Sequence, residues 1–455
     1  MNKTHILKLL LAATIGILSA TAYSSDLEIG VCTHMGQNRY SWSQVKAAMD
    51  DLGVTSFRDE IYWKTLERTD KSITLSATPT AIQAALAAYP NYRGMLIADY
   101  GHPNYDEGNQ PYSDAGRNAY ARYAGALLNS YGNSIAYLEL WNEWNLGMGN
   151  ADRTPGSAAA YAALVKTSVP VIAPMKKSSR FLIGATGDDL NDWSWTKSLF
   201  SNGVASLADG YSVHLYNYMA GSKAVPAEMF ARLERLQSIL TSMNNGTEYP
   251  IYVTEFGWPT NDSAGGVSQE LSGAYIARFI MQATAYKWLK GVWIYDLFND
   301  GTDTTDREQN FGLYNPDGTP KAGTCSVRSA ISLVHNYRYI NKGIGPNSVS
   351  WLQYENTTAS TTVFVLFNGL KGGSSYVALN AKPSALCDSK FSPPTAPTIT
   401  QAIHTANTTT TMDSSSPSTA TGSDSTAGTF EIGEIPQVIF IKGTGKTASN
   451  IFSSL

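Results

Sequence analysis

The chain has 455 residues, of which 43% are hydrophobic and 11% aromatic, and its formal net charge is −4. This length is sufficient for one large domain and a smaller one. The slightly acidic balance provides no basic surface for nucleic acid or for an anionic membrane, so neither is expected as a partner. The sequence carries no signal for an oligomeric state.

Residues 1–22 have the pattern of a secretory signal peptide. Lys3 and Lys8 lie at the start of an apolar run that extends to Ala20, and residues 20–22 (ATA) fit the A-x-A cleavage pattern. The alternative is an uncleaved membrane anchor, but the run is short for spanning a bilayer. We found no later run of transmembrane length. We therefore expect export to the periplasm or the extracellular space, with no membrane insertion after signal removal.

Between residues 26 and 340 the sequence alternates short apolar runs with helical patterns. The expected strands are 27–34, 54–60, 92–101, 134–145, 181–187, 210–218, 250–258 and 291–300. The expected helices are 41–53, 78–89, 114–131, 157–175, 192–201, 226–243, 267–287 and 325–337. Continuous apolar strands alternating with helices indicate a parallel sheet that is buried on both faces. Eight such units predict an α/β fold of the (β/α)8 TIM-barrel class.

Residues 341–455 have a different composition. Four β-branched and aromatic segments, 348–356, 361–369, 374–380 and 428–443, predict a small antiparallel β-sandwich after the barrel. A Ser/Thr/Pro-rich tract at about 392–428 interrupts them. Such a composition cannot form a core, so we expect a long mobile insertion there.

The chain contains three cysteines, Cys32, Cys325 and Cys387. An odd number leaves at least one thiol free in an exported protein. Cys325 and Cys387 are a possible disulfide between the end of the barrel and the sandwich, although their spacing does not establish the pairing.

Two glutamates, Glu143 and Glu255, follow the fourth and seventh expected strands. In a TIM barrel the active site lies at the carboxyl ends of the strands, so these carboxylates should converge. Converging carboxylates are what glycosidic bond cleavage requires. Asn142 offers an amide to a sugar hydroxyl beside Glu143, whereas Arg58 or His214 can donate to Glu255 and keep it ionised. We therefore expect Glu143 to be the general acid/base and Glu255 the nucleophile.

The remaining candidates are polar and aromatic side chains at the same strand ends. They are His34, Arg58, Trp63, His102, Asn142, Trp144, His214, Tyr216, Trp258 and Tyr295. Trp63 and Trp258 fit core packing as well as they fit sugar stacking. The histidines lack the close spacing of zinc ligands, so we expect neither a metal nor a cofactor.

The two glutamate segments, LELWNEWN (138–145) and IYVTEFGW (251–258), resemble the paired motifs of clan A glycoside hydrolases. This resemblance implies hydrolysis with retention of configuration, with Arg58, His214 and Tyr216 as supporting residues. The segment IGVCTHMGQ (29–37) and the following sandwich are most similar to glycoside hydrolase family 39 and its bacterial exopolysaccharide endoglycosidases. Families 5 and 30 share the barrel and both glutamates. Trp144 departs from the pattern because many relatives carry Pro there.

The expected function is therefore an exported retaining glycoside hydrolase whose partner is a polysaccharide or oligosaccharide. An endo-acting exopolysaccharide or β-glycan hydrolase fits this pattern. The alternatives are an exo-acting, xylosidase-like β-glycosidase, a non-catalytic carbohydrate-binding protein on the same barrel, and a surface or matrix protein carried by the Ser/Thr-rich segment.

Overall fold

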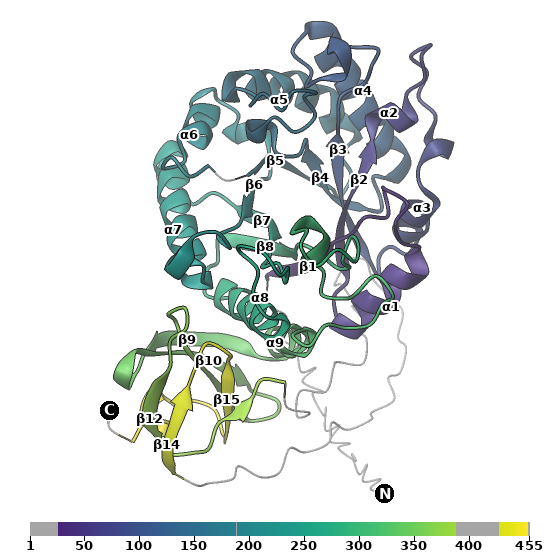
Figure 1. Cartoon of the computed structure of the whole chain (residues 1–455). Helices are drawn as coiled ribbons and strands as arrows, with labels where there is room; N and C mark the ends of the chain where they lie inside the picture. Colours follow the sequence, from purple (N-terminus) through teal and green to yellow (C-terminus); the bar gives the residue numbers. More distant parts are fainter. Residues whose placement is uncertain (1–25, 188, 388–426, 454–455) are drawn as a thin grey trace, which may run out of the picture.

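The structure is a computed structural model that describes residues 26–187, 189–387 and 427–453. The predicted signal peptide, and the predicted insertion up to residue 426, lie outside these residues. The described chain forms a barrel with a smaller β-domain beside helices α8 and α9 (Figure 1). This confirms the predicted fold class of a TIM barrel followed by a β-sandwich.

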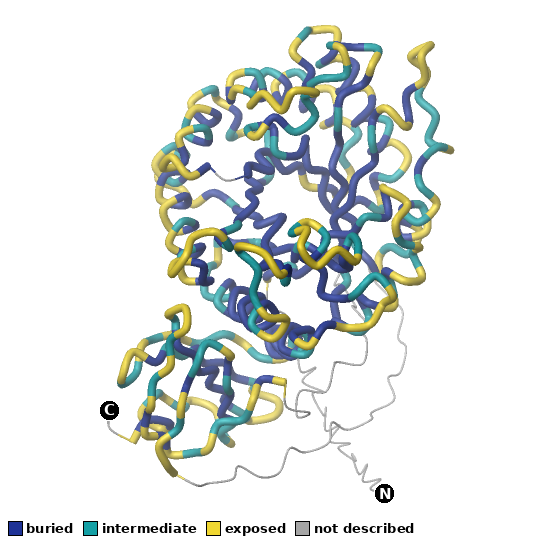
Figure 2. Tube along the Cα trace, viewed as in Figure 1, coloured by how far each residue is buried: buried dark blue, intermediate teal, exposed yellow. Residues whose placement is uncertain are grey.

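The barrel is closed by eight parallel strands in sequence order. They are β1 (Glu28–Cys32), β2 (Ser56–Tyr62), β3 (Arg93–Asp99), β4 (Ile135–Leu140), β5 (Arg180–Thr186), β6 (Gly210–Leu215), β7 (Ile251–Phe256) and β8 (Leu289–Ile294). Nearly all of their residues are buried, as in strands covered on both faces (Figure 2).

The helices surround the strands (Figure 1). They are α1 (Trp42–Leu52), α2 (Trp63–Leu66), α3 (Thr80–Ala87), α4 (Asp114–Tyr131), α5 (Ala158–Ile172), α6 (Ser194–Ser201), α7 (Pro226–Met243), α8 (Gln269–Ala283) and α9 (Thr324–Asn336). Local sequence sets their ends. Ser41 and Gln44 form a capping box at the start of α1, and Gly53 ends that helix with a φ of 76°.

The helix α5 and the short turn after it reach transmembrane length, although no segment after the signal peptide was expected to do so. Residues Ala158–Met175 form an 18-residue stretch that is, by length and composition alone, long and apolar enough to cross a membrane. Its buried residues, among them Tyr161, Leu164 and Val165, belong to the barrel core. The apolar face of this helix therefore covers the barrel strands.

The smaller domain has a five-stranded antiparallel sheet and a two-stranded one. Its strands are β9 (Arg338–Ile344), β10 (Val349–Asn356), β11 (Thr361–Asn368), β12 (Ser375–Leu379), β13 (Ser384–Ala385), β14 (Gly428–Ile432) and β15 (Gln437–Lys442). Sequence reasoning missed β9, which pairs with β10 immediately after the last barrel helix.

Buried polar and aromatic contacts join the two domains. Arg278 of α8 is fully buried, lies 4.6 Å from the ring centroid of Phe367 and donates to the backbone oxygen of Glu434 at 3.3 Å. The hydroxyl of Tyr354 donates to the backbone oxygen of Met281 at 2.7 Å. The sandwich therefore packs on α8, away from the carboxyl ends of the barrel strands.

A disulfide between Cys325 and Cys387 also links α9 to the sandwich, and Cys32 is a buried free thiol. The disulfide closes a loop across 62 positions, so the chain-entropy account gives a stabilisation of about 4 kcal/mol. We expect the double variant Cys325→Ser/Cys387→Ser to unfold at a clearly lower denaturant concentration. Reduced wild type should unfold with the variant, and the variant should be insensitive to reductant. Equal midpoints for oxidised wild type and the variant would contradict this prediction.

Candidate active site

A cavity of about 510 Å³ lies at the carboxyl ends of the barrel strands. Seven of the twelve predicted site residues line it: His34, Arg58, Asn142, Glu143, Tyr216, Glu255 and Tyr295. They come from positions in or directly after β1, β2, β4, β6, β7 and β8. The cavity therefore lies at the strand ends where the sequence predicts the active site.

The two predicted carboxylates meet in this cavity although 112 positions separate them. One carboxylate oxygen of Glu143, one of Glu255 and a ring nitrogen of His214 lie within 4.8 Å of one another. Glu143 follows β4 in the left-handed region, with a φ of 44°, and its backbone N–H donates to the oxygen of Ala185 at 3.0 Å. Such a backbone conformation in a non-glycine residue is typical of functional sites.

Three side chains hold Glu255 in its ionised form. Arg58 Nη1 donates to its Oε1 at 2.7 Å, and the Tyr216 hydroxyl donates to its Oε2 at 2.9 Å. His214 Nδ1 lies 3.4 Å from Oε2. Burial alone would raise the pKa of Glu255, but the His214 ring, the Arg58 guanidinium and the Tyr216 hydroxyl together lower it below its ordinary value.

His214 connects the two carboxylates. Its Nδ1 lies 2.8 Å from Glu143 Oε1, and its Nε2 lies 3.3 Å from Arg58 Nη2. Burial would lower the pKa of His214, but the charge of Glu255 and the contact with Glu143 raise it above its ordinary value, so Nδ1 carries a proton toward Glu143. Sequence reasoning placed His214 among the substrate-binding residues, but the structure places it behind the carboxylates rather than in the lining of the cavity.

Arg58 is the centre of the buried network beneath the cavity. Besides Glu255, it donates to Asn142 Oδ1 at 2.9 Å and to Glu139 Oε2 at 2.7 Å. Burial would lower the pKa of Arg58, but the ion pairs with Glu139 and Glu255 raise it well above its ordinary value. Asn142 Nδ2 also donates to the Tyr100 hydroxyl at 2.9 Å, which leaves one amide hydrogen for a substrate.

The structure corrects the prediction for three tryptophans, which are core residues. Trp63, Trp144 and Trp258 are 0%, 1% and 0% exposed and do not line the cavity. The indole N–H of Trp63 donates to Glu67 at 2.7 Å, and that of Trp258 donates to Asn217 at 3.0 Å. Their side chains point into the layer between strands and helices, where aromatic surface is removed from water.

His102 also lies outside the cavity lining. Its Nε2 lies 2.9 Å from the backbone oxygen of Glu67, and its Nδ1 accepts the N–H of Asn104 at 3.0 Å. The ring of His102 therefore ties the loop after β3 to the backbone of Glu67, which directly follows α2. His102 is 4% exposed, and protein groups engage both of its ring nitrogens.

Sequence reasoning missed several residues that line the cavity. They are Gln37, Tyr62, Tyr100, Arg153, Tyr218, Arg307, Glu308 and Phe311, with others from the same loops. Tyr216 and Tyr218 both follow the end of β6 at Leu215, so Tyr218 lies in the loop after that strand. Arg153, Arg307 and Glu308 come from long loops, where periodicity gives no signal.

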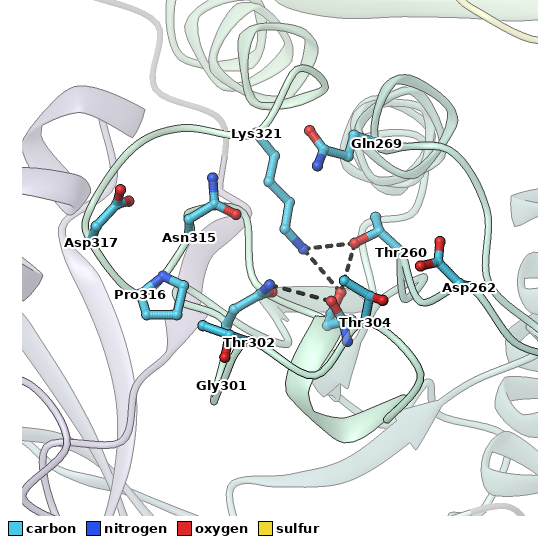
Figure 3. Close-up of a pocket in the computed structure, with 12 residues that line it drawn as sticks. Thr260, Asp262, Gln269, Gly301, Thr302, Thr304, Asn315, Pro316, Asp317 and Lys321 are labelled. Atoms are coloured by element: carbon cyan, nitrogen blue, oxygen red, sulfur yellow. Dashed lines mark hydrogen bonds between the residues drawn. The ribbon is translucent and has the colours of Figure 1, made fainter.

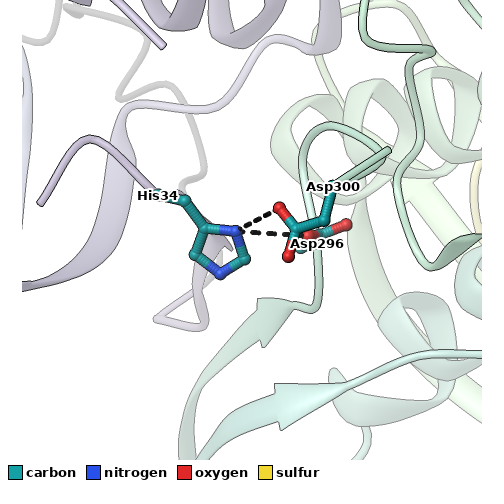
Figure 4. Close-up of side chains that lie close together, drawn as sticks. All are labelled: His34, Asp296 and Asp300. Carbon is teal, nitrogen blue, oxygen red and sulfur yellow. Dashed lines mark hydrogen bonds and ion pairs between the residues drawn. The ribbon is translucent and has the colours of Figure 1, made fainter. Parts of the chain in front are cut away.

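Two groups of described residues have the ligand types and spacing that a metal ion needs. One is the Glu143, His214 and Glu255 group. The other is His34, Asp296 and Asp300 at the edge of the cavity, where His34 Nδ1 lies 2.7 Å from Asp300 and 3.7 Å from Asp296 (Figure 4). Arg39 also lies 3.7 Å from Asp300. His34 and Arg39 therefore both pair with Asp300, whereas burial raises the pKa of Asp296 to about 8.

A second cavity of about 470 Å³ lies behind the loop that follows β8 (Figure 3). The buried amine of Lys321 donates there to Thr260 Oγ1 at 2.8 Å and to the backbone oxygen of Asn310 at 3.0 Å. Burial lowers the pKa of Lys321 to about 8. Since the loop carries Arg307 and Glu308 toward the first cavity, these contacts support one wall of the site.

Residues 21–295 match the family model described as Cellulase (glycosyl hydrolase family 5), and this range is more than half of the chain. The chain belongs to glycosyl hydrolase family 5. The expected clan A membership is thereby confirmed. The sequence match is to family 5 rather than to family 39, whereas the likeness to family 39 lies in the fold.

Known proteins similar to this family 5 chain include plant enzymes and a bacterial structure. The chain is 30% identical over 127 residues to a Hordeum vulgare protein assigned as glucan endo-1,3-beta-glucosidase GVI, over 25% of this chain and 40% of that protein. It is 24% identical over 183 residues to Arabidopsis thaliana glucan endo-1,3-beta-glucosidase 2, over 36% of this chain and 34% of that protein. The matches therefore span less than half of either relative.

Among solved structures, a family 39 glycoside hydrolase from Bacteroides cellulosilyticus WH2 has a similar fold. Its TM-score is 0.68 at 18% identity, over 92% of this chain and 82% of that chain. At this identity the similarity concerns the fold, and it covers both the barrel and the sandwich because it extends over nearly the whole chain.

Proposed function

We propose that this chain is an exported retaining glycoside hydrolase that cleaves within a β-linked glycan or exopolysaccharide. The observation that carries the proposal is the convergence of Glu143 and Glu255, since one oxygen of each lies within 4.8 Å of the other in a polar and aromatic cavity. Retaining enzymes place their two carboxyl groups about 5–5.5 Å apart, whereas inverting enzymes leave about 6.5–9.5 Å for a water molecule. The short spacing supports the retaining mechanism.

The surroundings of the carboxylates support different roles for them. Glu255 accepts from Arg58 and Tyr216 and is held ionised, as a nucleophile requires. Among the described residues Glu143 accepts from neither of these donors, and its carboxylate faces the imidazole N–H of His214. We assign it as the general acid/base, because a group that exchanges a proton in each step must not be locked in one charge state.

The reaction then proceeds in two displacements. A carboxylate oxygen of Glu255 attacks the anomeric carbon, the glycosidic bond breaks, and the Glu143 proton passes to the leaving oxygen. In the second step Glu143 accepts a proton from water, and the oxygen of that water displaces Glu255 from the anomeric carbon. Both carboxyl groups return to their starting protonation states.

The choice of an endo-acting β-glycan hydrolase rests on the relatives and on the cavity lining. Two plant relatives are named as glucan endo-1,3-beta-glucosidases. The aromatic rings of Tyr62, Tyr100, Tyr218 and Phe311 line the cavity on several sides of the carboxylates. Aromatic faces can pack against the apolar faces of sugar rings while tyrosine hydroxyls bind the polar edges. Export is supported by the disulfide, since disulfides persist in oxidising compartments.

The decisive experiment is digestion of β-1,3-glucan, xylan and bacterial exopolysaccharide, with product sizes measured over time. We expect oligosaccharides of mixed length to appear first, because an endo-acting enzyme cuts inside the chain. NMR of the first product should show the anomeric configuration of the substrate. Early release of monosaccharide alone would indicate the exo-acting alternative, and the opposite anomer would exclude the retaining mechanism.

A further inference from the structure

A third glutamate lies below the cavity in the same network. Glu139, within β4, is 0% exposed and is absent from the cavity lining. Its Oε2 lies 2.7 Å from both Nε and Nη2 of Arg58, and its Oε1 accepts the Thr254 hydroxyl at 2.9 Å. All its described partners are buried protein groups, so this carboxylate acts on substrate only through its neighbours.

The contact with Arg58 fixes the direction of the other guanidinium donors. A guanidinium is planar, so once Nε and Nη2 are held against Glu139 the direction of Nη1 is determined. Nη1 then points to Glu255 at 2.7 Å, and Nη2 to Asn142 at 2.9 Å. Glu139 therefore determines, through Arg58, which donors face the proposed nucleophile Glu255 and the amide of Asn142 beside the proposed acid/base.

Glu139 also balances charge. A guanidinium 2.7 Å from Glu255 with no other counter-ion would place its whole charge on that carboxylate and make it a weaker nucleophile. Glu139 shares this charge from the opposite side of Arg58, at the same distance of 2.7 Å. Arg58 thus keeps its hydrogen bond to Glu255 while much of its charge is neutralised.

We propose that Glu139 is a positioning residue that orients Arg58 toward Glu255 and offsets part of its charge, so that Glu255 keeps its hydrogen bond from Arg58 and remains nucleophilic. This inference rests on the proposed function, in which Glu255 attacks the anomeric carbon. It assigns to β4 a second functional carboxylate, four residues before Glu143 and on the protein side of the network.

The test separates charge from orientation with two variants. Glu139→Gln keeps the shape and the acceptor for Arg58 but removes one negative charge. A nearby negative charge favours protonated forms, so its loss should move both limbs of the kcat/KM profile to lower pH, by roughly one pH unit. Glu139→Asp keeps the charge but shortens the arm, so kcat should fall while both limbs stay in place. KM should change little in either variant, because Glu139 does not line the cavity.

Glu67→Gln is the matched control. Glu67 is 4% exposed, accepts the indole N–H of Trp63 and lies outside the cavity lining. Its substitution should lower the thermal midpoint and leave both pH limbs unchanged. The inference is overturned if Glu139→Gln leaves both limbs in place, or if Glu139→Asp has the kcat of wild type. If Glu139→Gln fails to fold, the Asp variant decides alone. Wild-type protein that releases no product from any glycan would instead refute the proposed function.

Discussion

Glu255→Gln is expected to lower kcat by at least about 10⁴-fold, the scale on which loss of a covalent nucleophile acts. The amide has nearly the same shape, and its oxygen can still accept from Arg58 Nη1, which donates to Glu255 at 2.7 Å. An amide oxygen does not form the glycosyl ester, so the first displacement fails. The fold and the affinity for glycan should remain close to those of wild type.

A 2-deoxy-2-fluoro glycoside with an activated leaving group provides the direct measurement. Wild type should accumulate a covalent adduct on the peptide that contains Glu255, and the Gln variant should not. Glu270→Gln is a matched control, because Glu270 is an exposed residue in the first turn of α8 outside the cavity. Near-wild-type turnover by Glu255→Gln, or an adduct on another carboxylate, would contradict the assignment.

The barrel was predictable because its strands are apolar on both faces and therefore stand out in the sequence. The predicted bounds 114–131 and 226–243 coincide with α4 and α7. The short strand β9 was not predictable in the same way. Its seven residues are mostly half-buried or exposed, and they include Arg338, Asn341 and Lys342. A polar edge strand has no apolar period from which it can be recognised.

The site was predictable where position along a strand decides it. Because all eight strands are parallel, a polar residue at a carboxyl end must lie near the others, and Glu143, Glu255 and Arg58 do so. Position along the strand does not tell whether a side chain points into the cavity or into the core. Trp144 directly follows Glu143 but packs against Trp141 and Tyr161 in the core. An aromatic side chain at a strand end is equally compatible with core and cavity.

The sequence also contained a sign of the role of Glu139 that the prediction did not use. A glutamate inside an otherwise apolar strand must be paired, because an unpaired buried charge is very costly. Arg58 of β2 is a candidate partner for Glu139. Their contact depends on the tilt and register of the neighbouring strands β2, β3 and β4. That geometry follows from barrel closure and not from local pattern.

Glu143→Ala is expected to lower kcat by about 10²- to 10⁴-fold for substrates with poor leaving groups, as loss of a general acid does. Substrates with leaving groups that need no proton should still form the Glu255 ester, which then accumulates because no base activates water. Gly187 adjoins the Glu143 carboxylate, since a Cβ at that position would lie 2.5 Å from Oε1. Removing the Glu143 side chain therefore opens a space beside Gly187, which has no side chain that could fill it.

Azide should enter that space and attack the anomeric carbon without general base assistance. The rescue should yield a glycosyl azide with the configuration of the substrate, because azide displaces Glu255 from the face that the leaving group vacated. Glu143→Gln fills the space and should be rescued less, and azide should not accelerate wild type. A glycosyl azide of inverted configuration would mean that azide replaces the nucleophile, and that the roles assigned to Glu143 and Glu255 must be exchanged.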